Sequence, residues 1–75
     1  MLLCDLLLNQ KAKIINISLP NNIKARFFDI GLREECDVII VRFSPFKDLI
    51  EIKANETFLA IRVLDSKYIE VKLYE

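Results

Sequence analysis

The stretch FFDIGLREECDVIIVRFSPFKD, residues 27–48, contains the only glycine of the chain, Gly31, between an aromatic pair and a long apolar run. The residues before this glycine, Ile23 to Ile30, carry apolar side chains at helical spacing and predict a two-turn helix. A glycine directly after such a segment is typical of the left-handed residue that ends a helix. We therefore expect Gly31 to end a helix and Leu32 to fold back onto Phe27 before the chain enters a strand.

Short segments rich in β-branched and alternating apolar residues predict five strands. Leu19-Pro20-Asn21-Asn22 ends the first strand, because proline cannot continue a ladder, and either asparagine can cap the helix. Residues 2–8 predict one helical turn over the core, and residues 64–67 predict a short turn or a single helical turn. Asn55-Glu56 predicts a tight hairpin turn. The predicted strands are residues 11–18, 37–43, 49–54, 57–63 and 68–74.

The strand predicted at residues 37–43, DVIIVRF, is apolar at positions that alternate to both faces. This pattern indicates a strand covered on both sides, with a helix packed across it. Regular short strands of this kind are typical of a small closed barrel. We therefore predict one mainly β domain over residues 1–75: a small β-barrel of about five strands with one short α-helix after the first strand.

Composition excludes several classes of function. The formal net charge is zero, which argues against a nucleic-acid partner. The chain has no histidine, the commonest general base, so we expect no enzyme. The opening MLLCDLLL lacks a basic region, and no apolar run is long enough for a membrane span, so we expect a cytoplasmic protein without direct membrane insertion. Hydrophobic residues make up 53% of the chain, more than a thin core needs, which predicts a partner surface.

Candidate metal ligands do not form a recognised motif. With no CxxC pair and no histidine, we expect no cofactor, although weak binding of a divalent metal stays open. The acidic neighbours of Cys36 disfavour a reactive thiolate. The candidate ligands are Cys4, Asp29, Glu34, Glu35, Cys36, Asp37, Asp48 and Asp65.

Phe46, beside Pro45 in a predicted turn, allows two interpretations. An exposed aromatic side chain in a turn costs free energy unless a partner covers it, so Phe46 indicates a binding surface. The alternative is that Phe46 folds back over the end of the barrel and belongs to the core. The sequence leaves both open.

Four segments, taken in order and at their spacing, resemble the FeoA family over essentially the whole chain. They are ARFFDIGL (Ala25–Leu32), VIIVRFSPFKDLIEI (Val38–Ile52), LAIR (Leu59–Arg62) and IEVKL (Ile69–Leu73), after the opening LCDLLLNQKAKI. The resemblance implies an SH3-like β-barrel and a partner, the cytoplasmic part of FeoB, a membrane transporter of ferrous iron with a GTPase domain. Leu49 stands where the family commonly has proline. Many family members also have glycine where this sequence has Asn9, Glu35, Lys47 and Asn55.

The resemblance implies a non-enzymatic adaptor of bacterial iron homeostasis that modulates the transport or GTPase activity of FeoB by protein–protein contact. Two alternatives stay open: a direct sensor that binds Fe²⁺ or another transition metal ion, and a regulatory module related to the C-terminal domain of iron-dependent repressors such as DtxR. A homo-oligomer is also possible. We assign Gly31, Ile40 and Ile52 to the fold. The expected partner surface lies near the helix end and the Ser-Pro turn and comprises Leu32, Arg33, Pro45, Phe46 and Leu49.

Overall fold

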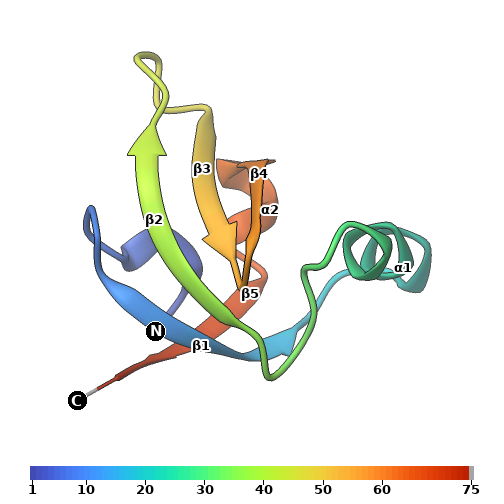
Figure 1. The fold of residues 1–75 in the computed structure, drawn as a ribbon. Coiled ribbons are helices and arrows are strands. Elements are labelled where there is room, and N and C mark those ends of the chain that lie inside the picture. The colour runs from blue at the N-terminus through green and yellow to red at the C-terminus, as the bar shows by residue number, and fades with distance from the viewer. Residues whose placement is uncertain (75) are drawn as a thin grey trace.

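The computed structural model describes residues 1–74 and has the predicted mainly β architecture (Figure 1). Five antiparallel strands form one sheet in the order β4-β3-β2-β1-β5. A short helix follows β1, as predicted. The elements are η1 (Leu3–Asp5), β1 (Lys11–Ile17), α1 (Asn21–Asp29), β2 (Asp37–Phe43), β3 (Leu49–Ala54), β4 (Thr57–Arg62), α2 (Val63–Ser66) and β5 (Ile69–Leu73).

The sheet curls as the predicted small barrel requires, but closure of the barrel is not detected within residues 1–74. Within residues 1–74, no strand pairing joins β4 to β5, the two strands at the ends of the sheet. The chain leaves β4 directly into α2, which carries it across to β5. The free side of β5 is instead covered by the N-terminus. There the Val71 N–H donates to the Met1 carbonyl at 2.7 Å, and Leu2 forms a bridge with Glu70.

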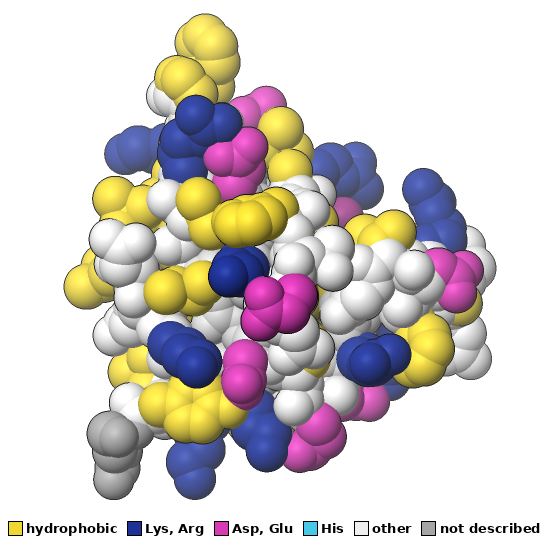
Figure 2. Space-filling view, viewed as in Figure 1, with side chains coloured by type: hydrophobic (Ala, Val, Ile, Leu, Met, Phe, Trp, Pro, Cys, Tyr) yellow, Lys and Arg dark blue, Asp and Glu magenta, His cyan; other side chains and the backbone are white. Residues whose placement is uncertain are grey.

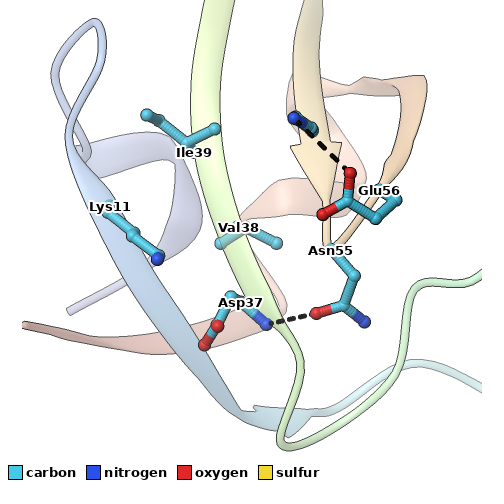
Figure 3. A pocket seen from close by; sticks show the side chains of 7 residues that line it. Lys11, Asp37, Val38, Ile39, Asn55 and Glu56 are labelled. Atoms are coloured by element: carbon cyan, nitrogen blue, oxygen red, sulfur yellow. Dashed lines mark hydrogen bonds and ion pairs between the residues drawn. The ribbon is translucent and has the colours of Figure 1, made fainter.

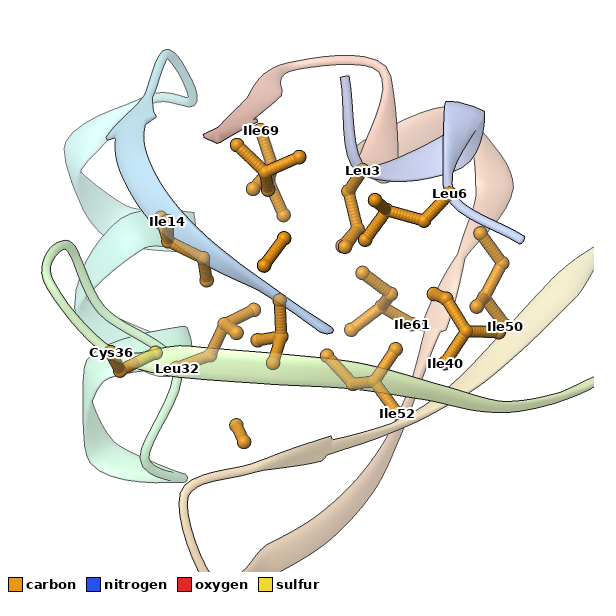
Figure 4. Close-up of a cluster of buried hydrophobic side chains, with 14 of the residues drawn as sticks. Leu3, Leu6, Ile14, Leu32, Cys36, Ile40, Ile50, Ile52, Ile61 and Ile69 are labelled. Carbon is orange, nitrogen blue, oxygen red and sulfur yellow. The ribbon is translucent and has the colours of Figure 1, made fainter. Parts of the chain in front are cut away.

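The core fills the concave side of the curled sheet (Figure 4). Leu3 and Leu6, from η1 and the residue after it, are buried in this core, as the prediction for residues 2–8 requires. In β1, Ile14 and Ile17 are buried while Ile15 is exposed. Ile14 and Ile17 share a face, although they are three residues apart, because the pairing of β1 with β5 is irregular between Ile14 and Asn16.

Only one face of β2 is covered, which corrects the expectation that a helix crosses this strand. Val38 and Ile40 are buried on the concave side. On the other side Ile39 is half-buried and Val41 is exposed. Helix α1 stands to one side of the sheet, and none of its residues is buried (Figure 1).

The first turn of α1 differs from the prediction. Pro20 is the residue before the helix, and its carbonyl accepts the N–H groups of Ile23 and Lys24 at 3.0 and 2.9 Å. Asn21 is therefore already helical, and no side chain caps this end. Proline suits the position because its fixed φ leads into the helix and it needs no N–H partner there.

The end of α1 confirms the role predicted for Gly31. Gly31 has φ = 98°, a left-handed value that suits glycine. The Leu32 N–H donates to the Phe27 carbonyl at 2.8 Å, and the Gly31 N–H donates to the Phe28 carbonyl at 3.1 Å. These are the two bonds of a Schellman motif. Leu32 then enters the core, and Phe27 packs against the same core.

Four residues other than glycine also have positive φ: Asn9 at 65°, Glu35 at 75°, Lys47 at 59° and Asn55 at 54°. These are the four turn positions at which many FeoA proteins have glycine. The backbone geometry of these turns is therefore present without glycine. Asparagine tolerates this conformation, but a glutamate or lysine adopts it at a cost of about 1–2 kcal/mol.

We predict that Lys47→Gly stabilises the protein. The change removes the left-handed strain but adds chain entropy to the unfolded state, so the expected gain in the free energy of unfolding is about 0.5–1 kcal/mol. The melting temperature should rise by about 2–6 °C in thermal unfolding followed by circular dichroism. Lys47→Ala is the matched control, because it removes the same charge but keeps the Cβ atom. Equal melting temperatures for the two variants would contradict this explanation.

Candidate functional site

The turn between β2 and β3 is held by one side chain, Ser44. The Lys47 N–H donates to the Ser44 carbonyl at 2.9 Å, and the Ser44 N–H donates to the Leu49 carbonyl at 3.0 Å. The Ser44 hydroxyl donates to Asp48 Oδ1 at 2.6 Å and accepts the N–H groups of Asp48 and Leu49 at 3.2 and 3.1 Å. Pro45 is the second residue of this turn, a position that proline favours. The backbone on both sides of Phe46 is therefore fixed.

Phe46 projects from this fixed turn into solvent. Its exposed fraction is 90%, the largest among the exposed large hydrophobic residues, and Pro45 beside it is also exposed. The interpretation that Phe46 folds back over the barrel end is therefore wrong. Leu49, at the start of β3, is 38% exposed. Figure 2 shows the resulting hydrophobic projection above the sheet at the β2–β3 turn.

The same hydrogen bonds set the charge of the turn. The Ser44 hydroxyl, together with backbone N–H groups, stabilises the carboxylate of Asp48 and lowers the pKa of this side chain. Next to the turn, Arg42 and Glu51 form an exposed ion pair at 2.6 Å, which raises the pKa of Arg42. Asp48, Arg42 and Glu51, near the base of Phe46, are thus held by local partners.

The expected partner surface is only partly assembled. Leu32 has no exposed area and belongs to the core, so it cannot contact a partner in this structure, and we remove it from the surface. Arg33 is exposed, with its guanidinium 5.2 Å from the centre of the Phe28 ring. It precedes β2, whereas the Ser44–Asp48 turn follows β2, and a seven-residue strand spans about 20 Å. The structure therefore brings together Pro45, Phe46 and Leu49 and leaves Arg33 at the opposite end of β2 (Figure 1).

The acidic and thiol side chains do not converge. Within residues 1–74, no three of the Cys, Asp and Glu side chains come together in a group that could hold a metal ion. Cys36 is buried in the core and Cys4 is half-buried. The proposed ligand Glu35 pairs instead with Lys13 at 3.1 Å, and Glu34 pairs with Lys24 at 3.3 Å. The carboxylates of Glu34 and Glu35 thus form ion pairs with neighbouring lysines.

A hollow of about 350 Å³ opens beside the start of β2, between Lys11, Ile39 and Glu56 (Figure 3). Its polar groups are engaged with one another. The Asp37 N–H donates to Asn55 Oδ1 at 3.3 Å, and Glu56 forms an ion pair of 3.9 Å with Lys53. These paired groups give the hollow no arrangement of acid, base and nucleophile.

Near this hollow, the Tyr74 hydroxyl donates a hydrogen bond to the Asp37 carboxylate. This bond, and the negative charge of Asp37, raise the pKa of Tyr74. The Lys11 ammonium lies 5.6 Å from the centre of the Tyr74 ring. The hydrogen bond joins Tyr74 to β2, so Asp37 has a structural role.

Two exposed apolar surfaces were missed in the sequence. Phe58 on β4 is 68% exposed on the convex side of the sheet, with the Lys53 ammonium 5.4 Å from its ring centre. The apolar side of α1, with Ile23 and Phe27, borders a groove near β4. The alternation of β4 could have predicted that Phe58 is exposed, because buried Ile61 lies on the opposite face of the strand. The pattern of α1 predicted an apolar face but not that this face stays accessible.

Within residues 1–74, no helix is both long and apolar enough to cross a membrane. The longest, α1, has nine residues.

Comparison with solved structures gives the same fold with little sequence identity. The solution structure of FeoA from Chlorobium tepidum matches with a TM-score of 0.94 and 25% identity, over 100% of this chain and 71% of that protein. Iron(II) transport protein A from Clostridium thermocellum matches with a TM-score of 0.90 and 22% identity, over 97% of this chain and 45% of that one. A FeoA-like protein from Clostridium acetobutylicum matches with a TM-score of 0.86 and 21% identity, over 100% of this chain and 87% of that protein. No curated protein sequence matches the chain.

A family model, the FeoA domain, matches residues 1–73, nearly the whole chain. The protein therefore belongs to the FeoA family, a family of ferrous iron transport.

Proposed function

We propose that the protein is a non-enzymatic, cytoplasmic accessory of bacterial ferrous iron uptake that binds the cytoplasmic part of a FeoB transporter. It acts by surface contact and modulates the transport or GTPase activity of FeoB. Family membership supports the role in iron transport. The observation that carries the binding surface is the 90% exposure of Phe46 on a hydrogen-bonded turn.

Phe46 has the properties of an interface anchor. Burial of an exposed phenylalanine side chain contributes about 1.5–3 kcal/mol, and aromatic residues dominate the energetics of many interfaces. The Ser44 hydrogen bonds fix the turn before binding, so little backbone entropy is lost when the partner covers it. Pro45 and Leu49 extend the apolar contact on both sides of Phe46. The proposed surface is therefore Pro45, Phe46 and Leu49.

We predict that Phe46→Ala and Leu49→Asp both weaken binding to the cytoplasmic GTPase domain of FeoB from the same organism. For Phe46→Ala the Kd should rise about 10-fold to 100-fold, the equivalent of losing the burial free energy of the ring. Isothermal titration calorimetry under anaerobic conditions measures this change. Phe58→Ala is the matched control, because it removes another exposed phenylalanine from β4 and should leave the Kd unchanged.

If Phe46→Ala binds FeoB as tightly as the wild type, the proposed surface is wrong. A parallel titration with Fe²⁺ alone distinguishes the adaptor from a metal sensor. Saturable heat with iron in the absence of FeoB, accompanied by shifts of Asp and Cys resonances, would contradict the adaptor.

We also predict that Ser44→Ala raises the pKa of Asp48 towards its ordinary value. The hydroxyl of Ser44 is the main cause of the lowered pKa, so its removal destabilises the carboxylate. Because the folded pKa lies below the unfolded one, this interaction stabilises the turn above the unfolded pKa and is lost as the pH falls through the folded pKa. Titration of the Asp48 carboxyl carbon by NMR checks the shift, with Ser18→Ala as the control. An unchanged titration of Asp48 in Ser44→Ala would contradict the role of Ser44.

A further inference from the structure

The outer edge of β4 carries unpaired backbone groups. Ala54 and Thr57 close a two-residue hairpin, so Thr57, Leu59 and Ile61 direct their N–H and C=O groups to β3. The backbone groups of Phe58 and Ala60 then point away from the sheet. In the part of the chain that the structure describes, no backbone hydrogen bond reaches either residue from that side.

The two edge strands of the sheet, β5 and β4, differ in how their outer backbone groups are covered. The edge of β5 is covered by Met1 and Leu2. β4 lacks two of the usual protections: it contains no proline, and its six residues pair with β3 without a bulge. An edge of this length with free backbone groups is a template for another strand.

Helix α1 lies beside this strand. A Cβ atom at Gly31 would lie 3.7 Å from the Thr57 hydroxyl, so the residues that follow α1 meet the start of β4. The helical segment and the end of β4 also line one groove of about 420 Å³. Its lining residues are Ile23, Arg26, Phe27 and Ile30 from the helical segment, with Arg62 and Asp65 opposite.

The groove has two unmet requirements on its two sides. Amphipathic helices ordinarily bury their apolar side, whereas Ile23 and Phe27 of α1 are only half-buried. The free N–H and C=O groups of Phe58 and Ala60 belong to β4, whose last residue, Arg62, lines the groove. An extended peptide meets both requirements, because its backbone pairs with β4 while alternate side chains pack on Ile23 and Phe27. A docked helix would leave the backbone groups of β4 unpaired.

We propose that this groove binds an extended segment of a partner protein, which adds to β4 as a sixth strand of the sheet. The charges define the segment further. Arg62 is already paired with Asp65 at 3.3 Å, whereas Arg26 forms no ion pair within residues 1–74. The segment therefore combines apolar residues with acidic ones, at least one of which lies within reach of Arg26. This surface is separate from Phe46 and does not depend on the function proposed above.

The test is a titration of the ¹⁵N-labelled full chain with the acetylated and amidated peptide Val-Glu-Val-Glu-Val-Glu. We expect amide shifts along β4 and α1 and none at the Ser44–Asp48 turn. Hydrogen exchange at the Phe58 and Ala60 amides should slow about tenfold when the peptide is at about ten times its Kd. Absence of shifts at β4 at millimolar peptide, or shifts confined to the turn, would overturn the proposal.

Three controls separate strand addition from non-specific contact. The same peptide with N-methyl groups on alternate amides, placed on the face that pairs, should not bind. Arg26→Glu should weaken binding of the acidic peptide and strengthen binding of Val-Lys-Val-Lys-Val-Lys. Ala60→Pro removes an outward N–H without loss of a ladder bond and should abolish binding, whereas Ala60→Ser keeps it.

If Ala60→Pro fails to fold, the N-methylated peptide on the wild-type chain still decides the question. Equal binding of both peptides would overturn strand addition. Shifts of β4 that depend on protein concentration without peptide would show that a second copy occupies the edge, which also overturns the proposal. Phe46→Ala should bind the peptide as the wild type does, so this test and the FeoB test fail independently.

Discussion

The reversal of the chain at Gly31 is the constraint on which the rest of the sheet depends. The left-handed glycine ends α1 and lets Leu32 enter the core. The next residues join β1 at once: the Glu35 N–H donates to the Ile14 carbonyl at 2.8 Å, and the Ile14 N–H donates to the Cys36 carbonyl at 3.0 Å. These bonds align β2 with β1, and β2 is the middle strand of the sheet. An error of one residue there would turn Val38 and Ile40 away from the core.

The other left-handed positions divide into two kinds. Asn9 and Asn55 tolerate positive φ, so their turns cost little. Glu35 and Lys47 do not, and the strain of Lys47 lies one residue after Phe46. The hydrogen bonds of Ser44 on both sides compensate for this strain, as strained residues require. The exposed aromatic ring of Phe46 and the strained residue thus share one rigid turn.

Elements that depend on local signals were predicted well from the sequence. Alternation gave β2 and β3 with their observed bounds, and the glycine after an apolar segment gave the end of α1. Contacts between distant elements were not predictable in this way. The pattern of β2 showed two apolar faces but not that one stays open. Leu32 was assigned to the partner surface, although its expected contact with Phe27 already indicated an apolar environment. Closure of the sheet depends on the same kind of contact, since α2 connects β4 to β5 and the N-terminus pairs with β5.

The position of α1 follows from how it is anchored. Leu19 before the helix and Leu32 after it pack with the core, as does Phe27, and Lys24 is tied to Glu34 at 3.3 Å. The helix is therefore held mainly by its flanking residues rather than by a buried face of its own. The groove beside β4 is therefore bordered by a helix whose apolar side is only half-buried. Ile23 and Phe27 thus keep apolar area that an added strand could cover, while the core contacts of Leu19 and Leu32 stay in place.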